Sequence, residues 1–460
     1  MTNWQGKTIL VIGAARQGMA ATRFLASHGS EVILTDIRPE QNFIEQTRQF
    51  KALPVRFVFG SHPSKLLEKV DGICISGGVP LDIPLIIRAR KMNIPLTNDT
   101  QLFLDLAQAK VIGITGSAGK TTTTTLIGEI AKSGIFPGQR VWVGGNIGNP
   151  LIDQVENMCS EDWVVMELSS FQLELMQTSP SIAVVLNITP NHLDRHKNMR
   201  AYTTAKANIL RYQNSTNWAI INREEQGSFN LKSSVIGKIS TFGFKKPKGG
   251  LIGTFIEENT LKYFDGETTI PLMTTDSIQL LGQHNLMNAL AACAVGIIAG
   301  FTVSAMQEGI QSVKGIPHRL ELIREFNGIR WYNDSIATAP ERVIAALRAI
   351  SGPLVLLLGG RDKDLPWTDL AAVLHEQAPK VIVFGEAGTM IKNVLLEFEG
   401  DAPKYQISQV NDLRDAVSEA SKIAESDDSV LLSPGGTSYD AFLNFEERGN
   451  SFKQLVEAIQ

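Results

Sequence analysis

Short apolar runs alternate with amphipathic stretches along most of the chain, and this pattern predicts strands that alternate with helices. At the start of the chain the apolar runs are rich in β-branched residues, and residues 17–28 and 83–92 between them show helical spacing. Strands and helices that alternate in this way form a parallel sheet wrapped by helices. We therefore predict a Rossmann-like α/β domain over residues 1–100.

The alternating pattern restarts at Val111 and again after residue 312. Residues 234–275 differ, because their short, turn-rich segments are typical of antiparallel strands. We predict an α/β chain of three domains. The N-terminal domain is followed by a central P-loop ATPase-like α/β domain with an antiparallel flap over residues 101–312, and by a C-terminal Rossmann-like α/β domain over residues 313–460.

The composition narrows the class of protein. A chain of 460 residues is too long for one core and fits two or three domains. With 43 Lys and Arg against 47 Asp and Glu, the net charge of −4 gives no reason to expect nucleic acid or an anionic membrane as partner. The three cysteines are far apart, which indicates neither a disulfide framework nor a zinc site. The apolar segment Leu286–Phe301 is too short to span a bilayer and predicts a buried helix. Since no signal-peptide pattern opens the sequence, we expect a cytoplasmic protein.

The stretch GITGSAGKTTTTT, residues 113–125, is a candidate phosphate-binding loop. The strict pattern G-x-x-x-x-G-K-[ST] fails by one residue, because isoleucine stands where the first glycine belongs. A strand, a turn with Gly116 and Gly119, and a helix that opens on Lys120 and Thr121 would still direct backbone N–H groups at one anion. The lysine can neutralise β- and γ-phosphate oxygens, and the threonine hydroxyl can ligate a bridging Mg²⁺. A plain glycine turn with an exposed lysine is the alternative.

Further polar groups follow apolar strands of the same block. Glu167 ends the run WVVME, at the strand end where open α/β sheets place their ligands. A buried carboxylate there is costly unless it is paired or bound to a cation, and a cap of the next turn is the alternative. His192 follows IAVVLNIT, and Lys206 lies further along, within a predicted helix. Each of these two alone would more often be structural or solvated, but beside a phosphate loop they indicate a site.

Eight motifs in order give the chain a resemblance to a known family. They are TGSAGKTT, GGNIG, ELSSFQLE, NHLDRH with a later Tyr and Lys, GQHNLMNALAA, PHRLE, DSIAT and SPGGTSYDAFLNFEERG. This set resembles the ATP-dependent Mur ligases of peptidoglycan synthesis, and most of all the branch that adds D-glutamate to UDP-N-acetylmuramoyl-L-alanine. The resemblance implies a UDP-sugar substrate-binding domain, an ATP-binding domain and an amino-acid-binding domain, in that order. It also implies an acyl-phosphate intermediate and release of ADP and phosphate, and we expect a monomer that acts on these small molecules.

The catalytic residues that the resemblance implies are Lys120, Glu167, His192 and Lys206. Thr121 and Glu167 would hold a first Mg²⁺ and His192 a second. Lys206 matches a lysine that family members carbamylate, which turns a cation into an anion that helps to organise the metal site. The implied ATP contacts are Gly116, Ser117, Gly119, Lys120, Thr121, Thr122, Asn285, Asn288, Arg319 and Asp334.

The first block carries a glycine fingerprint, GAARQG, that departs from the dinucleotide pattern. In the dinucleotide pattern the middle glycine lets the backbone approach a pyrophosphate. Ala15 stands at that position here, so binding of NAD is disfavoured. A role in the turn alone is the alternative for Gly13 and Gly18. By the resemblance, the contacts of the UDP-substrate are Arg16, Gln17, Asp36, Ile37, Gly78, Asn146, Ser169 and His192.

The third block carries the amino-acid pocket that the resemblance implies, formed by Lys363, Ser438, Tyr439 and Phe445. Ile336 stands in DSIAT where some members carry lysine, which removes one cation from that pocket. A sister ligase that adds another amino acid is the alternative, although the chain lacks the D-N-P-R segment of the lysine or diaminopimelate adders and the Y-N-A-N-P of the dipeptide adder. A nucleotide-binding switch without ligase chemistry is a third interpretation.

Overall fold

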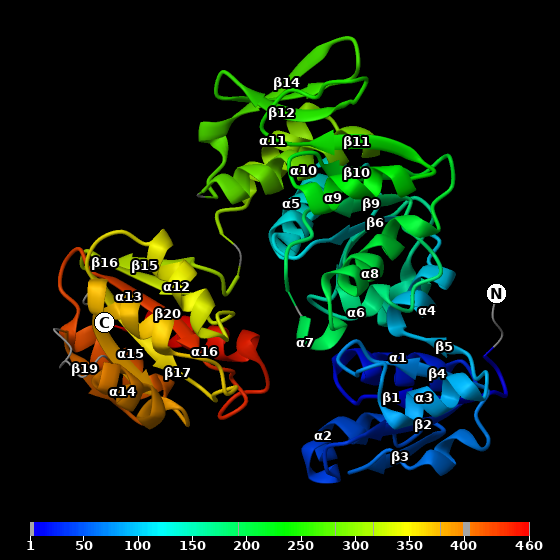
Figure 1. Ribbon diagram of the computed structural model, residues 1–460, viewed down its shortest axis with the longest axis horizontal. Coiled ribbons are helices and arrows are strands. Elements are labelled where there is room, and N and C mark those ends of the chain that lie inside the picture. The colour runs from blue at the N-terminus through cyan, green and yellow to red at the C-terminus, as the bar shows by residue number, and fades with distance from the viewer. Residues whose placement is uncertain are drawn as a thin grey trace. The chain divides into compact units, whose positions relative to one another are not determined.

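The computed structural model describes residues 4–191, 193–280, 282–315, 317–377, 379–398 and 405–459, the side chains of 193 and 194 excepted. The chain divides into two compact units, Met1–Lys314 and Gly315–Gln460. Figure 1 shows that each unit is built of sheets covered by helices. In the described ranges, no helix has the length and apolar character needed to cross a membrane.

The first sheet of the first unit has five parallel strands in the order β3-β2-β1-β4-β5. The strands are β1 (Thr8–Ile12), β2 (Glu31–Asp36), β3 (Val55–Phe59), β4 (Gly72–Ile75) and β5 (Leu96–Thr97). The helices around them are α1 (Arg16–Ser27), η1 (Glu40–Asn42), α2 (Ile44–Thr47), η2 (Arg48–Phe50), η3 (Ser64–Leu67), α3 (Pro84–Lys91) and α4 (Asp99–Leu106). The strand order reverses at β1, so the turns after β1, β2 and β4 meet at one edge, where ligands bind in such sheets.

The second sheet has nine strands in the order β14-β13-β12-β11-β10-β9-β6-β8-β7. The strands are β6 (Lys110–Thr115), β7 (Val141–Gly145), β8 (Trp163–Glu167), β9 (Ile182–Val185), β10 (Trp218–Asn222), β11 (Lys238–Phe242), β12 (Gly253–Glu257), β13 (Thr260–Phe264) and β14 (Thr269–Thr274). The antiparallel flap is confirmed for β12 to β14. The prediction of antiparallel pairing is wrong for β11. This strand runs parallel to β10, because short helices cross over between the two strands.

Helices cover both faces of this second sheet. They are α5 (Lys120–Gly134), η4 (Leu151–Asn157), α6 (Ser170–Leu173), α7 (Leu193–His196), α8 (Met199–Arg211), α9 (Gln226–Phe229), η5 (Asn230–Ser234), η6 (Thr275–Ser277), α10 (Gln283–Ala299) and α11 (Val303–Ser312). The buried helix predicted from the apolar segment is confirmed, since residues 288–296 of α10 are all buried.

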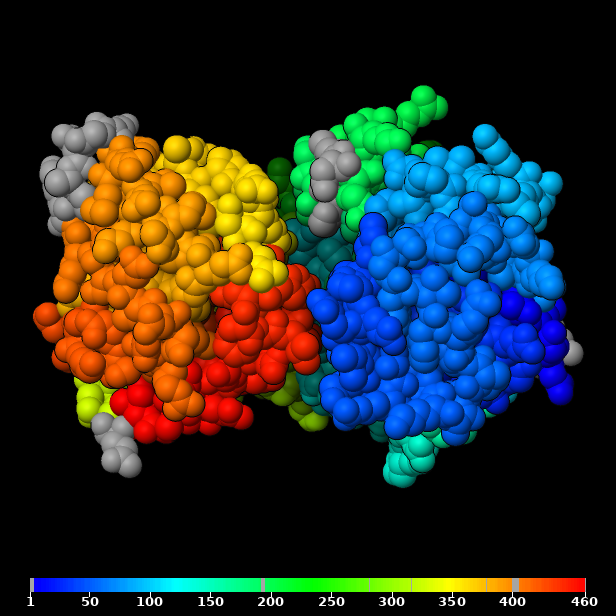
Figure 2. Space-filling model, turned by 90° about the horizontal axis from the view of Figure 1, so that it is seen from below, coloured from blue at the N-terminus to red at the C-terminus, as the bar shows by residue number. Residues whose placement is uncertain are grey.

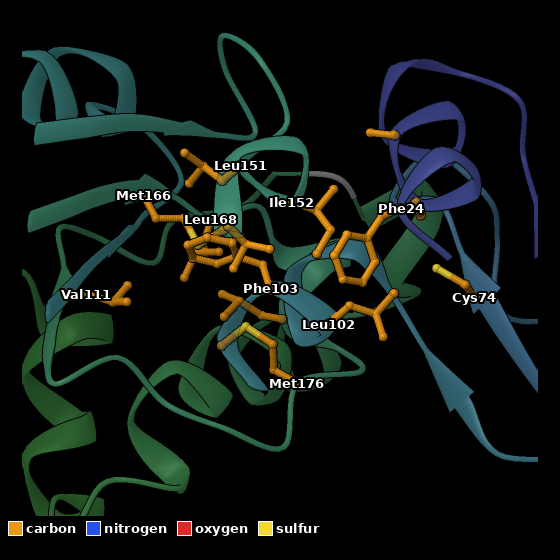
Figure 3. Packing of buried hydrophobic residues seen from close by; sticks show 14 of the residues in the cluster. Phe24, Cys74, Leu102, Phe103, Val111, Leu151, Ile152, Met166, Leu168 and Met176 are labelled. Carbon is orange, nitrogen blue, oxygen red and sulfur yellow. The ribbon is translucent and has the colours of Figure 1, made fainter. Parts of the chain in front are cut away.

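One buried cluster joins the two sheets of the first unit. Leu102 and Phe103 of α4 are each 1% exposed and belong to the same cluster as Phe24 of α1 and Met166 of β8. Figure 3 shows these side chains packed around α4. Figure 2 shows the light-blue residues that end the N-terminal part lying against green residues of the same unit. Because a packed core does not deform easily, the loops at the edges of the two sheets keep a defined arrangement.

The second unit has one six-stranded sheet in the order β15-β16-β20-β17-β18-β19. The strands are β15 (Glu321–Phe326), β16 (Ile329–Asn333), β17 (Leu354–Gly359), β18 (Lys380–Phe384), β19 (Ile407–Gln409) and β20 (Ser429–Gly435). The helices are α12 (Pro340–Ala349), α13 (Thr368–Gln377), α14 (Gly388–Glu397), α15 (Leu413–Ile423) and α16 (Phe445–Glu457). All strand pairs are parallel except the β15–β16 hairpin, which confirms the predicted α/β fold.

Candidate active site

The candidate phosphate loop has the strand, turn and helix that the sequence predicts. It follows β6, which lies between β9 and β8 in the second sheet, and α5 begins at Lys120. Gly119 has φ +82° and a Cβ there would lie 2.5 Å from Asn288 Oδ1, so both the backbone conformation and the close approach require glycine. The Lys120 Nζ donates to the Gly116 carbonyl at 3.0 Å. Main-chain N–H groups at the start of a helix of 15 residues make this loop suited to a phosphate.

Glu167, Thr121 and Asn146 meet beside the loop. Glu167 ends β8 and is 2% exposed. The Thr121 hydroxyl donates to its Oε2 at 2.8 Å, and the Asn146 amide donates to its Oε1 at 2.8 Å. Glu167, which is predicted to hold metal, therefore contacts Asn146, which is predicted to bind the UDP-substrate. Within the described part of the chain, no group of three or more His, Cys, Asp or Glu could hold a metal ion. Magnesium in phosphate sites often has one or two carboxylates and takes its other ligands from water and substrate.

Lys206 of α8 contacts the same loop. Its side chain is 1% exposed, and its Nζ donates to the Gly116 carbonyl at 2.9 Å and to Thr115 Oγ1 at 3.2 Å. Burial, together with the nearby Lys120 charge, lowers the pKa of Lys206 from its usual 10.5 to about 6, although the Glu167 charge acts in the opposite direction. Two lysine amines thus share one carbonyl oxygen, and the buried one is held as a neutral amine at neutral pH.

His192 lies outside the described residues, so its predicted metal and substrate roles stay predictions. Its neighbours along the chain are fixed to the phosphate loop. Ser117 N–H donates to the Asn187 carbonyl at 3.0 Å, and the Ser117 hydroxyl donates to the Thr189 carbonyl at 2.9 Å.

The two asparagines predicted for ATP lie in the first turns of α10. Asn288 donates to Asn285 Oδ1 at 3.1 Å, and the Thr123 hydroxyl donates to Asn288 Oδ1 at 3.3 Å. Asn288 is also the residue that lies against Gly119, so α10 abuts the phosphate loop. Thr122, the remaining predicted ATP contact of α5, is buried.

The predicted UDP residues of the first sheet surround the ends of β1 and β2. Asp36 ends β2, and its carboxylate accepts the Ala14 N–H at 2.7 Å and the Arg38 guanidinium at 2.9 and 3.0 Å. Burial alone would raise the pKa of Asp36, but the hydrogen bonds from Arg38 and Ala14 lower it below its ordinary value. The carboxylate therefore stays charged and closes the glycine turn. The sequence predicted neither this structural role of Asp36 nor the contribution of Arg38.

The remaining predicted UDP residues follow strands of the first sheet, except Ser169, which follows β8 of the second sheet. Ile37 is 70% exposed beside Asp36, and Arg16 and Gln17 begin α1. Arg195 donates to the Gly78 carbonyl at 3.2 Å. Ser169 is the N-cap of α6, where it and Gln172 form a capping box.

In the second unit, the predicted ATP residues Arg319 and Asp334 flank the β15–β16 hairpin. Asp334 follows β16, and its carboxylate accepts the Leu320 N–H at 3.2 Å and the Ser433 hydroxyl at 2.8 Å. Burial raises the pKa of Asp334 to about 6, which these hydrogen bonds and the Arg319 charge oppose.

Three of the predicted amino-acid residues lie on loops that follow β17 and β20, and Phe445 begins α16. Lys363 Nζ donates to Thr338 Oγ1 at 3.4 Å, and burial together with nearby guanidinium groups lowers the pKa of Lys363. Ser438 is 2% exposed and Tyr439 is 63% exposed. The Phe445 ring meets the His318 ring edge-on at 6.1 Å. The residues are thus brought to one end of the sheet.

Arg448 is a residue of this region that sequence reasoning missed. Its side chain is fully buried, and it donates to Ser335 Oγ at 3.0 Å, to the Ser335 carbonyl at 2.9 Å and to the Gly436 carbonyl at 3.2 Å. It ties the DSIAT loop to the loop after β20, and so supports both walls of the predicted pocket. The sequence signals this role only by placing Arg448 in the segment NFEERG. An arginine on the exposed face of a helix would give the same local sequence pattern.

The fold and the loop define the first unit as a nucleotide-phosphate-binding α/β protein. Three family descriptions match the chain: "Mur ligase MurD-like, N-terminal domain" over residues 7–98, "Mur ligase middle domain" over 114–296 and "Mur ligase, glutamate ligase domain" over 318–436. The chain belongs to the Mur ligase family.

Curated relatives match the chain over its full length. A UDP-N-acetylmuramoylalanine--D-glutamate ligase of Symbiobacterium thermophilum is 39% identical over 449 residues, which cover 98% of this chain and 97% of that protein. A protein of the same name from Clostridium botulinum is 36% identical over 454 residues, which cover 98% and 97%. Among solved structures, MurF from Acinetobacter baumannii superposes with a TM-score of 0.58 at 17% identity, covering 99% of this chain and 92% of that one. MurC from Thermotoga maritima superposes with a TM-score of 0.56 at 20% identity, covering 98% and 99%.

Proposed function

We propose that this chain is an ATP-dependent amide-bond ligase that adds D-glutamate to UDP-N-acetylmuramoyl-L-alanine in peptidoglycan precursor synthesis. The full-length similarity to D-glutamate ligases, up to 39% identity in the relatives named above, carries the proposal. The cluster of Lys120, Glu167 and Lys206 around the phosphate loop supports it, because that cluster has the groups that phosphoryl transfer to a carboxylate requires.

The chemistry begins with a carboxylate, which is a poor electrophile. One of its oxygens attacks the γ-phosphoryl group of ATP, ADP leaves, and an acyl phosphate forms. The amine of D-glutamate then attacks the acyl carbon, and phosphate leaves through a tetrahedral intermediate. The loop amides and Lys120 hold the phosphates in line and stabilise the charge that develops on them, so catalysis is mainly positioning and electrostatics.

The residues present fit a magnesium ion. Thr121 Oγ1 and Glu167 Oε2 are hard oxygen donors 2.8 Å apart beside the phosphate loop. We propose that these two residues hold one Mg²⁺, and that His192 and a carbamate on Lys206 contribute to a second metal site. Bound Mg²⁺ would neutralise charge on the β- and γ-phosphates.

The carbamate is the finer part of the proposal. A neutral Lys206 amine attacks the carbon of carbon dioxide, an N–C bond forms, and one amine proton leaves to solvent. The burial of Lys206 and its shared carbonyl with Lys120 support this step, because burial keeps the Lys206 amine neutral and an anion there would pair with the Lys120 charge.

The substrate contacts follow from the same reasoning. We propose that the residues at the edge of the first sheet, together with Asn146 and Ser169, bind the UDP-substrate. Lys363, Ser438, Tyr439 and Phe445 would bind D-glutamate, with Arg319 and Asp334 at the ATP. We further propose that the enzyme acts as a cytoplasmic monomer.

Phosphate release from ATP tests the proposal. The protein is incubated with ATP, Mg²⁺ and UDP-N-acetylmuramoyl-L-alanine, and each amino acid is added in turn. We expect release only with D-glutamate. Release with a different amino acid would assign a sister activity, and no substrate-dependent release at all would reject ligase chemistry.

A further inference from the structure

His196 ends α7 and lies between three elements that carry predicted site residues. Its side chain is 1% exposed. The elements are α6, which Ser169 caps, α8, which carries Lys206, and the phosphate loop. Figure 1 shows α6, α7 and α8 together at one end of the second sheet, and α8 contacts both short helices. Nothing in the proposed chemistry uses this histidine.

The two ring nitrogens of His196 face α6. Nε2 forms a hydrogen bond with Ser170 Oγ at 2.9 Å, and Nδ1 lies 3.1 Å from Glu174 Oε1. The ring stacks on Phe171 with a centroid distance of 5.2 Å and an interplanar angle of 3°. The carboxylate at Nδ1 favours the tautomer that carries its proton there, which leaves Nε2 to accept from the serine. Contacts with Ser170, Phe171 and Glu174 therefore fix the orientation of the helix that Ser169 caps.

The His196 ring is also linked to the phosphate loop through one residue, Tyr202. Tyr202 is 1% exposed, and its ring meets the His196 ring at 5.2 Å and 61°. The Tyr202 hydroxyl forms a hydrogen bond with Ser117 Oγ at 3.0 Å. The Lys206 amine lies over the Tyr202 ring, 4.8 Å from its centroid. Tyr202 thus touches both a residue of the phosphate loop and the lysine proposed to carry the carbamate.

We propose that His196 is a positioning residue that sets the substrate-side helix α6 and the phosphate loop in register with each other. Its nitrogens orient α6, and its ring edge orients Tyr202 against Ser117. The inference rests on the proposed function, since it assigns a role in the same reaction. The two halves of the role are chemically separable, because one uses nitrogen atoms and the other uses the ring itself.

Two substitutions separate the halves. His196→Phe keeps the ring that packs on Phe171 and Tyr202 but removes both nitrogens. We expect its KM for UDP-N-acetylmuramoyl-L-alanine to rise about tenfold, the factor expected for the loss of the hydrogen bond to Ser170, while its KM for ATP stays within about twofold. His196→Ala removes the ring as well, and we expect both KM values to rise. His196→Gln keeps an amide within reach of Ser170 and should restore most of the substrate KM.

His375→Phe is the matched control. His375 lies on α13 of the second unit, its Nδ1 lies 3.0 Å from the Ala371 carbonyl, and its ring meets Tyr405 edge-on at 5.2 Å. We expect this variant to change the melting temperature without changing either KM. Ser170→Ala removes the same hydrogen bond from the other side, and should raise the substrate KM even if His196→Phe does not fold.

The inference is overturned if His196→Phe, or Ser170→Ala in its place, keeps the wild-type substrate KM. A rise of both KM values by the same factor in His196→Phe would equally overturn it, because that pattern indicates general destabilisation. Wild-type protein without D-glutamate-dependent phosphate release would instead reject the proposed function, so the two failures are distinct.

Discussion

Lys206→Ala tests the proposed carbamate by removing the amine that would carry it. We expect the variant to lose activity by about 10²- to 10³-fold, the cost of losing one preorganised charged group in an active site. Because the lost group is proposed to be an anion, we expect a short carboxylic acid such as acetate to restore part of the activity. The lost side chain is 1% exposed, so its removal leaves an internal space that a small acid can fill.

The structure also gives a magnitude for the reactivity of this amine. With a pKa of about 6, roughly 99% of the Lys206 amine is neutral at pH 8. A lysine with the usual pKa of 10.5 is neutral to only about 0.3% at that pH, so burial increases the reactive form about 300-fold. We therefore expect carbon dioxide uptake at Lys206 to rise with pH through about 6 and to level off above it.

The assay is phosphate release at saturating substrates, with and without acetate, on variants whose thermal unfolding matches the wild type. Lys206→Met is the control, because its longer side chain fills the space and should leave the enzyme inactive and unrescued. Full turnover by Lys206→Ala without added acid would refute the carbamate. Equal rescue of both variants would place the acid elsewhere and refute the argument from the cavity.

Three further predictions follow from buried groups. Glu167→Gln should lower kcat by at least about 10²-fold and raise the Mg²⁺ concentration needed for half activity, and an unchanged Mg²⁺ dependence in steady-state kinetics would remove Glu167 from the metal site. Burial raises the pKa of Asp99 from its usual 3.8 to about 7, so its contribution to stability is complete below about pH 4 and is lost as the pH rises through 7. Asp99→Asn should therefore gain more stability at pH 8 than at pH 5, by up to about 3 kcal/mol in chemical unfolding, and an equal change at both pH values would contradict this sign. Arg448→Met should raise the KM for D-glutamate at least about tenfold, because the two loops that it ties together would separate, and a wild-type KM in a folded variant would show that they hold without it.

The fold was predictable from sequence wherever one strand and one helix alternate. The apolar runs that became β1, β8 and β20 are short and bounded by turns, so their place in parallel sheets followed directly. The direction of β11 could not be predicted in the same way. Its alternating pattern is shared by parallel and antiparallel strands, and only the crossover through α9 and η5 decides between them.

The candidate site was predictable where its chemistry is local in the sequence. The phosphate loop is one continuous motif, and Glu167 was found because it ends a strand next to that loop. The approach of Lys206 to the Gly116 carbonyl joins residues 90 positions apart, and only the resemblance to a family pointed to it. His192 and the domain boundaries stay predictions.

The residues that sequence reasoning missed act through distant contacts. Arg448 bonds to Ser335, 113 positions away, and His196 bonds to Ser170, 26 positions away. An arginine on a helix usually faces solvent and a histidine often does, and nothing local separates a surface position from one that a second element covers. Such roles become visible only when packing is known.

Transfer of an oxygen atom from substrate to phosphate is the most direct test of whether a carboxylate is activated by phosphorylation at this loop. UDP-N-acetylmuramoyl-L-alanine labelled with oxygen-18 in its carboxyl group is converted with ATP and D-glutamate, and the released phosphate is analysed by mass spectrometry. We expect each phosphate released during ligation to carry one labelled oxygen from the carboxyl group. Phosphate without label, alongside formation of the amide product, would contradict this expectation.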